Sequence, residues 1–450
     1  MMRLALAELR DHLNVWAGGL VVTLCCGAVG AWAASFAEMA AGSSGAAAVT
    51  LHDASTMVLS FSLVAAVPVL AATANLTVAA SREAYARWQL VGVRPGTVRA
   101  VVVAQMAVVG VMGAGVGFML GGLLFGPLYS YVMASSPRAL AVAPLVGWGR
   151  LPAVVLTVAC VFVCAGLGAA RRAAMTSPME ALRAPEPRRV GLTWVRVLVF
   201  VASVGLAGYA LATMVEAAGA GDANAVMTWS LVPCVFGVVA VACLAPVLLP
   251  VLMGAWTVVL PACATAWLLA RRSARHSLSA STSVETPVMV AFGLVAGMYS
   301  LVRLCELYAG ARGIPAGSGW YLETTVAFLM FGGPVLICAA GATVSVVMAA
   351  RNRERELSLL EAVGARPLLM VAVTVVEALV HTITATLAGT LTVLLFGAAT
   401  AAVMGVPLLS GLVLGPGLVV SGVGFVLVLT ALLLPAARAL SCPVATGLRL

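Results

Sequence analysis

The chain has 450 residues, of which 62% are hydrophobic and 9% are charged, with a formal net charge of +9. Soluble proteins carry about 25% charged residues, so this composition excludes a soluble fold and predicts an integral membrane protein. All 25 basic residues are arginine, and a chain without lysine cannot contain the phosphate-binding loop of an ATPase or form a Schiff base.

Ten apolar runs are long enough to cross a membrane as helices. They are continuous rather than alternating, which excludes a membrane β-barrel. With the N-terminus inside, 21 of the 25 arginines fall in cytoplasmic segments, which predicts a multi-pass protein of the cell membrane with both termini in the cytoplasm. The predicted spans cover residues 14–37, 54–79, 98–125, 149–170, 194–216, 226–252, 286–308, 322–349, 368–402 and 412–436.

The stretch from Trp256 to Ala270 is apolar enough for an eleventh span. It contains Pro261, and counting it as a span would reverse the second half of the chain and place 11 arginines outside. We therefore predict an interfacial elbow helix at this position.

The predicted fold is an all-α membrane bundle made of two parallel four-helix units. A basic segment containing Gly-x-Arg-Pro occurs at 81–95 and again at 353–367, and from its glycine onward the copies align without gaps at an offset of 272 residues. Six spans separate the copies, so the repeats are parallel. The connections outside are short, and no large extracytoplasmic domain is predicted. The predicted domains are a first four-span unit at 1–183, a two-span connector at 184–254, and the elbow helix with a second four-span unit at 255–450.

Each basic segment joins the second span of its unit to the third. In the second copy the pattern predicts an amphipathic helix over residues 351–363, a C-terminal cap at Gly364 and a new helix at Pro367. The first copy has Tyr85 and Trp88 as apolar anchors. A short helix ended by glycine and followed by a span forms a stiff lever. The alternative is a pair of ordinary arginine-rich loops, which two matched copies disfavour.

The second copy also carries a family resemblance. The run Arg-Glu-Leu-Ser-Leu-Leu-Glu-Ala-Val-Gly-Ala at 355–365, followed by a span with Glu377 and Gly389, resembles the FtsX-like permease family. That family is the membrane half of ABC systems such as the macrolide exporter, the lipoprotein-release complex and the bacitracin-type peptide exporters. The resemblance covers about 1–183 and 275–450. Gln105 stands where the family usually has a carboxylate.

The resemblance implies that both basic segments are coupling helices that dock on a separate ATPase dimer in the cytoplasm. ATP and Mg²⁺ would be bound by that partner, and no cofactor or nucleic acid is expected on this chain. The bilayer is a further partner, and a second permease chain is left open. The implied coupling residues are Arg82, Glu83, Arg87, Gly92 and Arg94, and then Arg353, Glu354, Arg355, Glu356, Glu361, Gly364 and Arg366.

Several polar residues lie within the predicted spans. Glu377 and His381 are four residues apart and share one helix face, where a hydrogen bond between spans is favoured over a proton relay. Arg303 and Glu306 are three apart, which favours an ion pair over a substrate headgroup site. Gln105 is the matching polar candidate in the first unit.

Small residues form a stripe in the third span. The glycines recur at four-residue spacing, which predicts close helix packing, and Gly389 mirrors them in the second unit. The four histidines are scattered and the ten cysteines lie almost entirely in apolar runs, so no metal site is predicted. The stripe consists of Gly113, Gly117 and Gly121.

We therefore expect the permease subunit of an ABC transporter, not an enzyme itself and without catalytic residues. It would couple ATP hydrolysis on the partner to export or extraction of an amphiphilic substrate such as an antimicrobial peptide, a lipid or a lipopeptide. The alternative is a mechanotransmitting subunit that regulates a cell-wall hydrolase or a sensor kinase without transport. An ion-coupled transporter is disfavoured by the parallel repeats. An intramembrane enzyme is disfavoured because the sequence lacks a nucleophile–base set.

Overall fold

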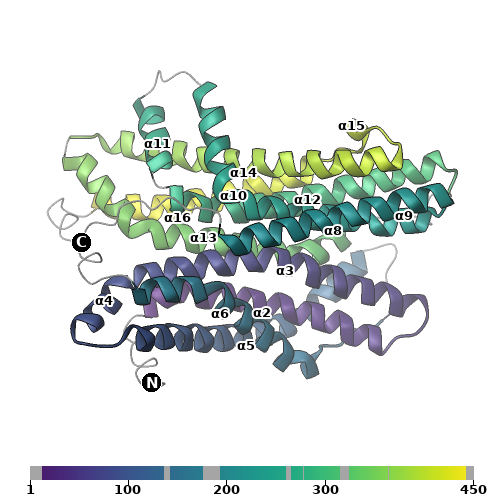
Figure 1. Ribbon diagram of the computed structural model, residues 1–450, viewed down its shortest axis with the longest axis horizontal. Coiled ribbons are helices and arrows are strands. Elements are labelled where there is room, and N and C mark those ends of the chain that lie inside the picture. Colours follow the sequence, from purple (N-terminus) through teal and green to yellow (C-terminus); the bar gives the residue numbers. More distant parts are fainter. Residues whose placement is uncertain are drawn as a thin grey trace. The chain divides into compact units, whose positions relative to one another are not determined.

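The computed structural model describes residues 13–135, 142–175, 193–259, 265–276, 278–314, 324–362 and 364–441. Within these ranges the chain is helical without any β-strand, which confirms the predicted all-α class. Ten helices of the described part are long and apolar enough to cross a membrane, and each overlaps one predicted span (Figure 1). The chain is therefore a multi-pass membrane protein. The ten are Val15–Ala41, Ala47–Ala80, Pro95–Ala134, Trp148–Met175, Trp194–Ala220, Ala223–Val258, Thr282–Ala311, Leu329–Met348, Pro367–Met404 and Gly415–Leu433.

Two of these helices are much longer than a bilayer requires. The one that begins at Pro95 has 40 residues and the one that begins at Pro367 has 38. About 20 residues are enough to cross the hydrocarbon core. Both long helices directly follow a Gly-x-Arg-Pro segment, so any movement of that segment is passed to a helix longer than the membrane is thick.

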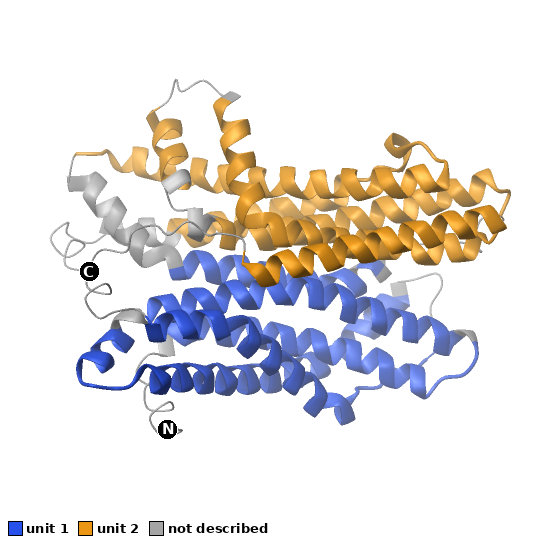
Figure 2. Cartoon of the chain, viewed as in Figure 1, with its two compact units in different colours: residues 1–186, 325–349 blue, residues 187–324, 350–450 orange. Residues whose placement is uncertain are grey.

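The chain folds into two compact units (Figure 2). Unit 1 contains residues 1–186 and 325–349, and unit 2 contains 187–324 and 350–450. Compact units reflect packing whereas the predicted domains reflect a duplication, so the domain boundaries stay predictions. The helices of unit 1 are α2 (Leu13–Ala41), α3 (Ala46–Ala80), α4 (Arg82–Leu90), α5 (Pro95–Ser135), η1 (Trp148–Arg150), α6 (Leu151–Met175) and most of α13 (Thr324–Ala362). Those of unit 2 are α8 (Trp194–Ala220), α9 (Ala223–Trp229), α10 (Leu231–Val259), α11 (Thr265–His276), α12 (Leu278–Ala311), α14 (Pro367–Met404), α15 (Leu408–Gly411) and α16 (Gly415–Ser441).

Unit 1 packs through small residues. The glycine stripe of α5 lies against α2, and a Cβ at Gly117 would overlap the backbone of Leu24. The part of α13 in this unit packs on α3 in the same manner, because Gly341 faces Val69. Lipid removes most of the hydrophobic drive between membrane helices, so close van der Waals contact at small residues is what holds them together.

Unit 2 is built around α12. In its candidate span 83% of the most apolar window is buried, against 22% for the spans of α8 and α16. α12 packs against α10, α14 and α16. Polar side chains on α12 are therefore shielded from lipid by neighbouring helices.

The predicted elbow helix at Trp256–Ala270 is wrong in its bounds. Trp256 lies near the end of α10 and Trp267 lies in α11, and their rings pack edge to face with centroids 5.9 Å apart. Pro246 and Pro250 each remove a backbone donor inside α10. The last turns of α10 and the whole of α11 run across the direction of α14 in the same unit (Figure 1). The segment is thus the meeting point of two helices rather than one short helix.

Candidate functional site

The two Gly-x-Arg-Pro segments have the same backbone geometry. Gly92 has a φ of +93° and Gly364 a φ of +92°, values in the left-handed region that favours glycine. The next helices, α5 and α14, begin at Pro95 and Pro367, where the fixed φ of proline suits the first turn. In both copies one helix therefore ends and a long one begins within the same short junction.

In the first copy the junction follows α4, which is fixed to the bundle by buried polar contacts. The Tyr85 hydroxyl donates a hydrogen bond to Gln105 Oε1 of α5 at 3.1 Å, and both residues are buried. Gln89 Nε2 donates to the Ala174 carbonyl of α6 at 3.1 Å. These two hydrogen bonds connect α4 to both α5 and α6.

The opposite face of α4 is exposed. Leu90 and Val91 are 62% and 87% exposed, and the side chains of Arg87 and Arg94 are exposed beside them. Large apolar side chains next to an exposed arginine at a helix end are typical of a surface that a partner covers.

The second copy differs in its helix. α13 runs without a break to Ala362, where the first copy breaks at Ser81 between α3 and α4. Beyond the glycine, Arg366 is exposed and Leu368 is 84% exposed. The remaining predicted coupling residues lie on helical backbone, and their side chains fall outside the described ones: Arg82, Glu83, Arg353, Glu354, Arg355, Glu356 and Glu361.

A cluster of three ionisable side chains lies inside unit 2. His381 Nδ1 is 2.8 Å from Glu285 Oε1 of α12, and His381 Nε2 is 3.8 Å from Glu377 Oε1 one turn earlier on α14. All three residues are buried, Glu285 to 1% exposure. The cluster joins α12 to α14 through charged or polar groups, which are rare and costly within membrane helices.

Glu285 was not among the residues predicted from the sequence. The predicted span began at residue 286, which left this carboxylate just outside, whereas α12 begins at Leu278. The available signal was an acidic residue directly before Thr286 and Pro287, at the start of an apolar run. Glu377 and His381 do share a face, but the shorter contact of the imidazole is to α12.

The cluster is not arranged to hold a metal ion. The two carboxylates approach opposite nitrogens of one imidazole ring, so they do not converge on a common point. Among the described residues no group of three His, Cys, Asp or Glu could hold a metal.

The other predicted polar and glycine positions are structural in their contacts. Arg303 Nη1 lies 2.8 Å from Glu306 Oε2, both partly exposed, as an ion pair within one helix. A Cβ at Gly389 would lie 2.6 Å from the ring of Phe292 on α12.

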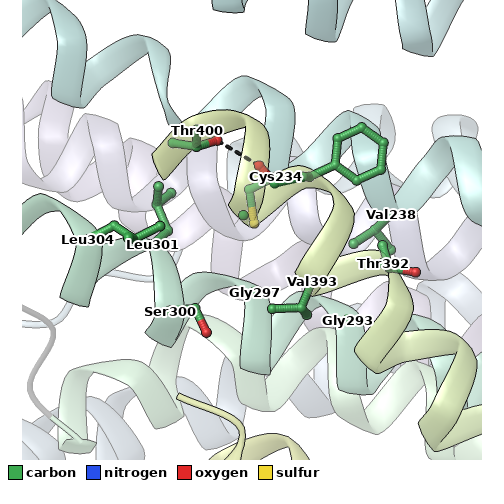
Figure 3. A pocket seen from close by; sticks show the side chains of 12 residues that line it. Cys234, Val238, Gly293, Gly297, Ser300, Leu301, Leu304, Thr392, Val393 and Thr400 are labelled. Atoms are coloured by element: carbon green, nitrogen blue, oxygen red, sulfur yellow. Dashed lines mark hydrogen bonds between the residues drawn. The ribbon is translucent and has the colours of Figure 1, made fainter. Parts of the chain in front are cut away.

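A small crevice opens between α10, α12 and α14 (Figure 3). Its walls are mainly apolar, and it has room for about one water molecule. The Thr400 hydroxyl donates a hydrogen bond to the carbonyl of Phe396 at 2.9 Å. Ser300 Oγ accepts a hydrogen bond from the backbone N–H of Val413 at 3.0 Å. These polar groups are engaged in helix packing rather than directed at a ligand.

No protein-family model and no curated protein matches the chain. The junctions and the buried polar groups are therefore the observations that bear on its function.

Proposed function

We propose that the chain is the membrane subunit of an ABC transporter of the FtsX-like permease type. A separate ATPase dimer in the cytoplasm would bind ATP and Mg²⁺ and dock on the two Gly-x-Arg-Pro junctions. The observation that carries the proposal is the pair of left-handed glycines, Gly92 and Gly364, each placed between a shorter helical segment and a helix that begins with proline.

The proposed coupling is mechanical. Docking would load the junction, and α5 or α14 would carry the displacement across the membrane because a helix is stiff along its axis. The contacts from Tyr85 to Gln105 and from Gln89 to Ala174 support this in the first copy, since they tie α4 to two spans at once. Such buried bonds each contribute about 1 kcal/mol, enough to fix the position of a short helix.

The chemistry of the exposed junction defines the surface of the partner. Arg94 requires a carboxylate, and Leu90 and Val91 require an apolar groove beside it. A groove at the surface of a nucleotide-binding domain that moves on ATP binding would meet both needs.

The proposed cargo is an amphiphile such as a peptide, a lipid or a lipopeptide. The crevice between α10, α12 and α14 has room for about a single water, so it does not support a soluble substrate at that place. Entry from the lipid side suits a cargo that already resides in the bilayer.

A charge-reversal experiment tests the docking. The tagged full-length chain is purified from its native membranes, and vanadate-sensitive ATP hydrolysis in the preparation is measured. The double variant Arg94→Glu, Arg366→Glu should lose the co-purifying ATPase and lower the ATP hydrolysis about tenfold or more, because each change would put a negative charge against the proposed acidic partner surface. The matched control is Arg312→Glu. This arginine directly follows the C-terminal end of α12 and lies over the Tyr308 ring.

The control should retain both the ATPase and its activity. The proposal is refuted if the unaltered chain brings down no ATP-hydrolysing subunit, or if the double variant keeps full activity. An extracytoplasmic hydrolase that co-purifies while no amphiphile stimulates the ATPase would instead favour the mechanotransmitting alternative.

A further inference from the structure

Glu285 has a buried oxygen atom without a hydrogen-bond partner. Its Oε1 lies 2.8 Å from His381 Nδ1. Its Oε2 is buried and makes no hydrogen bond within the described structure. An ionised carboxylate spreads its charge over both oxygens, and leaving one of them buried and unpaired is costly. The atom therefore needs something that the protein side chains around it do not supply.

The carboxylate of Glu285 indicates what is missing. Both ring nitrogens of His381 face carboxylate oxygens, which favours the doubly protonated imidazolium. The imidazole Nδ1 meets Oε1 of Glu285 and leaves the buried Oε2 without a hydrogen-bond donor. A proton on Oε2 makes this carboxyl group neutral, and neutral groups are far cheaper to bury than charged ones.

We propose that Glu285, His381 and Glu377 form a proton-binding site of unit 2, and that Glu285 Oε2 takes up and releases the proton. The step adds one proton to the anionic carboxylate and forms one O–H bond, with no other bond broken. Oε1 then becomes the carbonyl oxygen and still accepts the N–H of His381 Nδ1. The inference is independent of the ATPase partner proposed above, because it uses only contacts between α12 and α14.

The helices around the site leave it dependent on His381. α10 contributes no acidic, basic or histidine residue, and its titratable groups are the thiols of Cys234 and Cys243. Among the described side chains, Glu285 pairs with no cation other than His381. The other charged or titratable groups on packed helices are Arg196, Tyr209 and Glu216 on α8, Arg271, Arg272, Arg275 and His276 on α11, Tyr299, Arg303, Cys305, Glu306 and Tyr308 on α12, and Arg438 on α16.

α11 packs beside the site. Ala274 of α11 packs with Met253 and Val380, the residue before His381. On the same helix Arg271 is half-buried and Arg272 is exposed. Trp256 at the end of α10 donates its indole N–H to Thr384 Oγ1 at 3.0 Å, one turn beyond His381. A short helix with an exposed cation therefore packs against α14 beside His381.

Infrared spectroscopy of the full-length chain in lipid nanodiscs tests the proposal. A protonated carboxyl group gives a carbonyl band that ionised carboxylates lack and that shifts on exchange into D₂O. We expect such a band to disappear as the pH is raised and to be lost in Glu285→Gln. Glu306→Gln, which removes a partly exposed carboxylate from the same helix, should leave the band at its full amplitude.

A second variant keeps the test decisive if Glu285→Gln fails to fold. His381→Asn removes the cation that stabilises the carboxylate, so the band should persist to a higher pH than in the unaltered chain. Folding of each variant is checked by thermal unfolding and size-exclusion chromatography. A chain without any pH-dependent carboxyl band overturns the proposal, as does a folded Glu285→Gln protein that retains the full band or a folded His381→Asn protein with an unmoved titration.

Discussion

The two copies of the repeat share a backbone junction and differ in the polar groups of the span that follows. Gly92 and Gly364 have φ values within one degree of each other. Along α5 the aligned span of the first copy has Gln105 and Val109, whereas α14 has Glu377 and His381 at the same places. The conserved element is thus a helix ending, which requires one residue type for steric reasons.

The polar contents have diverged because membrane burial permits several solutions. Gln105 is neutral and accepts a hydrogen bond from the lever helix α4. Glu377 is acidic, and its copy carries a second acid and a histidine from two helices. The first copy uses its buried polar residue to hold α4, and the second concentrates ionisable groups inside the bundle. The comparison teaches that one repeated frame can hold a neutral hydrogen bond to a short helix in one half and a cluster of ionisable side chains in the other.

Exchanging the two matched residues is the strongest test of this difference. Gln105→Glu places a carboxylate in a fully buried position, and we expect a loss of about 3 kcal/mol or more in the free energy of unfolding at neutral pH. Glu377→Gln keeps a hydrogen-bonding group and should cost about 1 kcal/mol. Thermal unfolding in detergent, followed by tryptophan fluorescence, measures both.

The pH dependence of Gln105→Glu has a defined sign. The folded bundle disfavours the anion, so the folded state binds a proton more readily than the unfolded state, and stability should rise as the pH falls. An equal loss of unfolding free energy in the two exchanged variants would mean that the first copy tolerates a buried charge as well as the second. A Gln105→Glu protein whose stability does not change with pH would mean the same.

The matched glycines give a second and smaller contrast. A Cβ at Gly117 would meet the backbone of Leu24, which can move only with all of α2, whereas a Cβ at Gly389 would meet the ring of Phe292. We expect Gly117→Ala to cost about 2 kcal/mol in unfolding free energy and Gly389→Ala about 1 kcal/mol. Gly115→Ala, where a Cβ meets open space, is the neutral control. The reverse order of the two losses would contradict the packing described for unit 1.

Much of the fold was predictable because it depends on local patterns. A run of apolar residues long enough for the bilayer leaves a helix as the main option, and all ten predicted spans have a matching helix. Glycine followed by x-Arg-Pro specifies a left-handed helix end and a new helix start, and Gly364 and Pro367 have that geometry. Coupling to an ATPase stays a prediction, since it concerns a chain other than this one.

What could not be predicted depends on contacts between distant residues. Packing of residues 325–349 into unit 1 is decided by pairs such as Gly341 and Val69, which no local pattern reveals. Glu285 was not predicted because the polar residues Thr282, Ser283 and Thr286 beside it hide where the apolar run begins. Their hydroxyls can nevertheless form hydrogen bonds to backbone carbonyls within a helix. The break at Ser81 also has no counterpart in α13, and both segments have the same amphipathic pattern.

The smallest expected effect concerns the feature that both copies share. Gly92→Ala and Gly364→Ala each force a side chain into the left-handed region, at a cost of about 1 kcal/mol in unfolding free energy. Nothing lies within 4 Å of a Cβ at either position, so the cost should be purely conformational and equal in the two variants. Gly96→Ala in the first turn of α5 has similar open space and an ordinary helical φ, and it should be neutral or slightly stabilising. A clearly smaller loss for Gly364→Ala would show that the unbroken helix α13 can absorb the change and that the junctions, alike at the glycine, are not equally rigid.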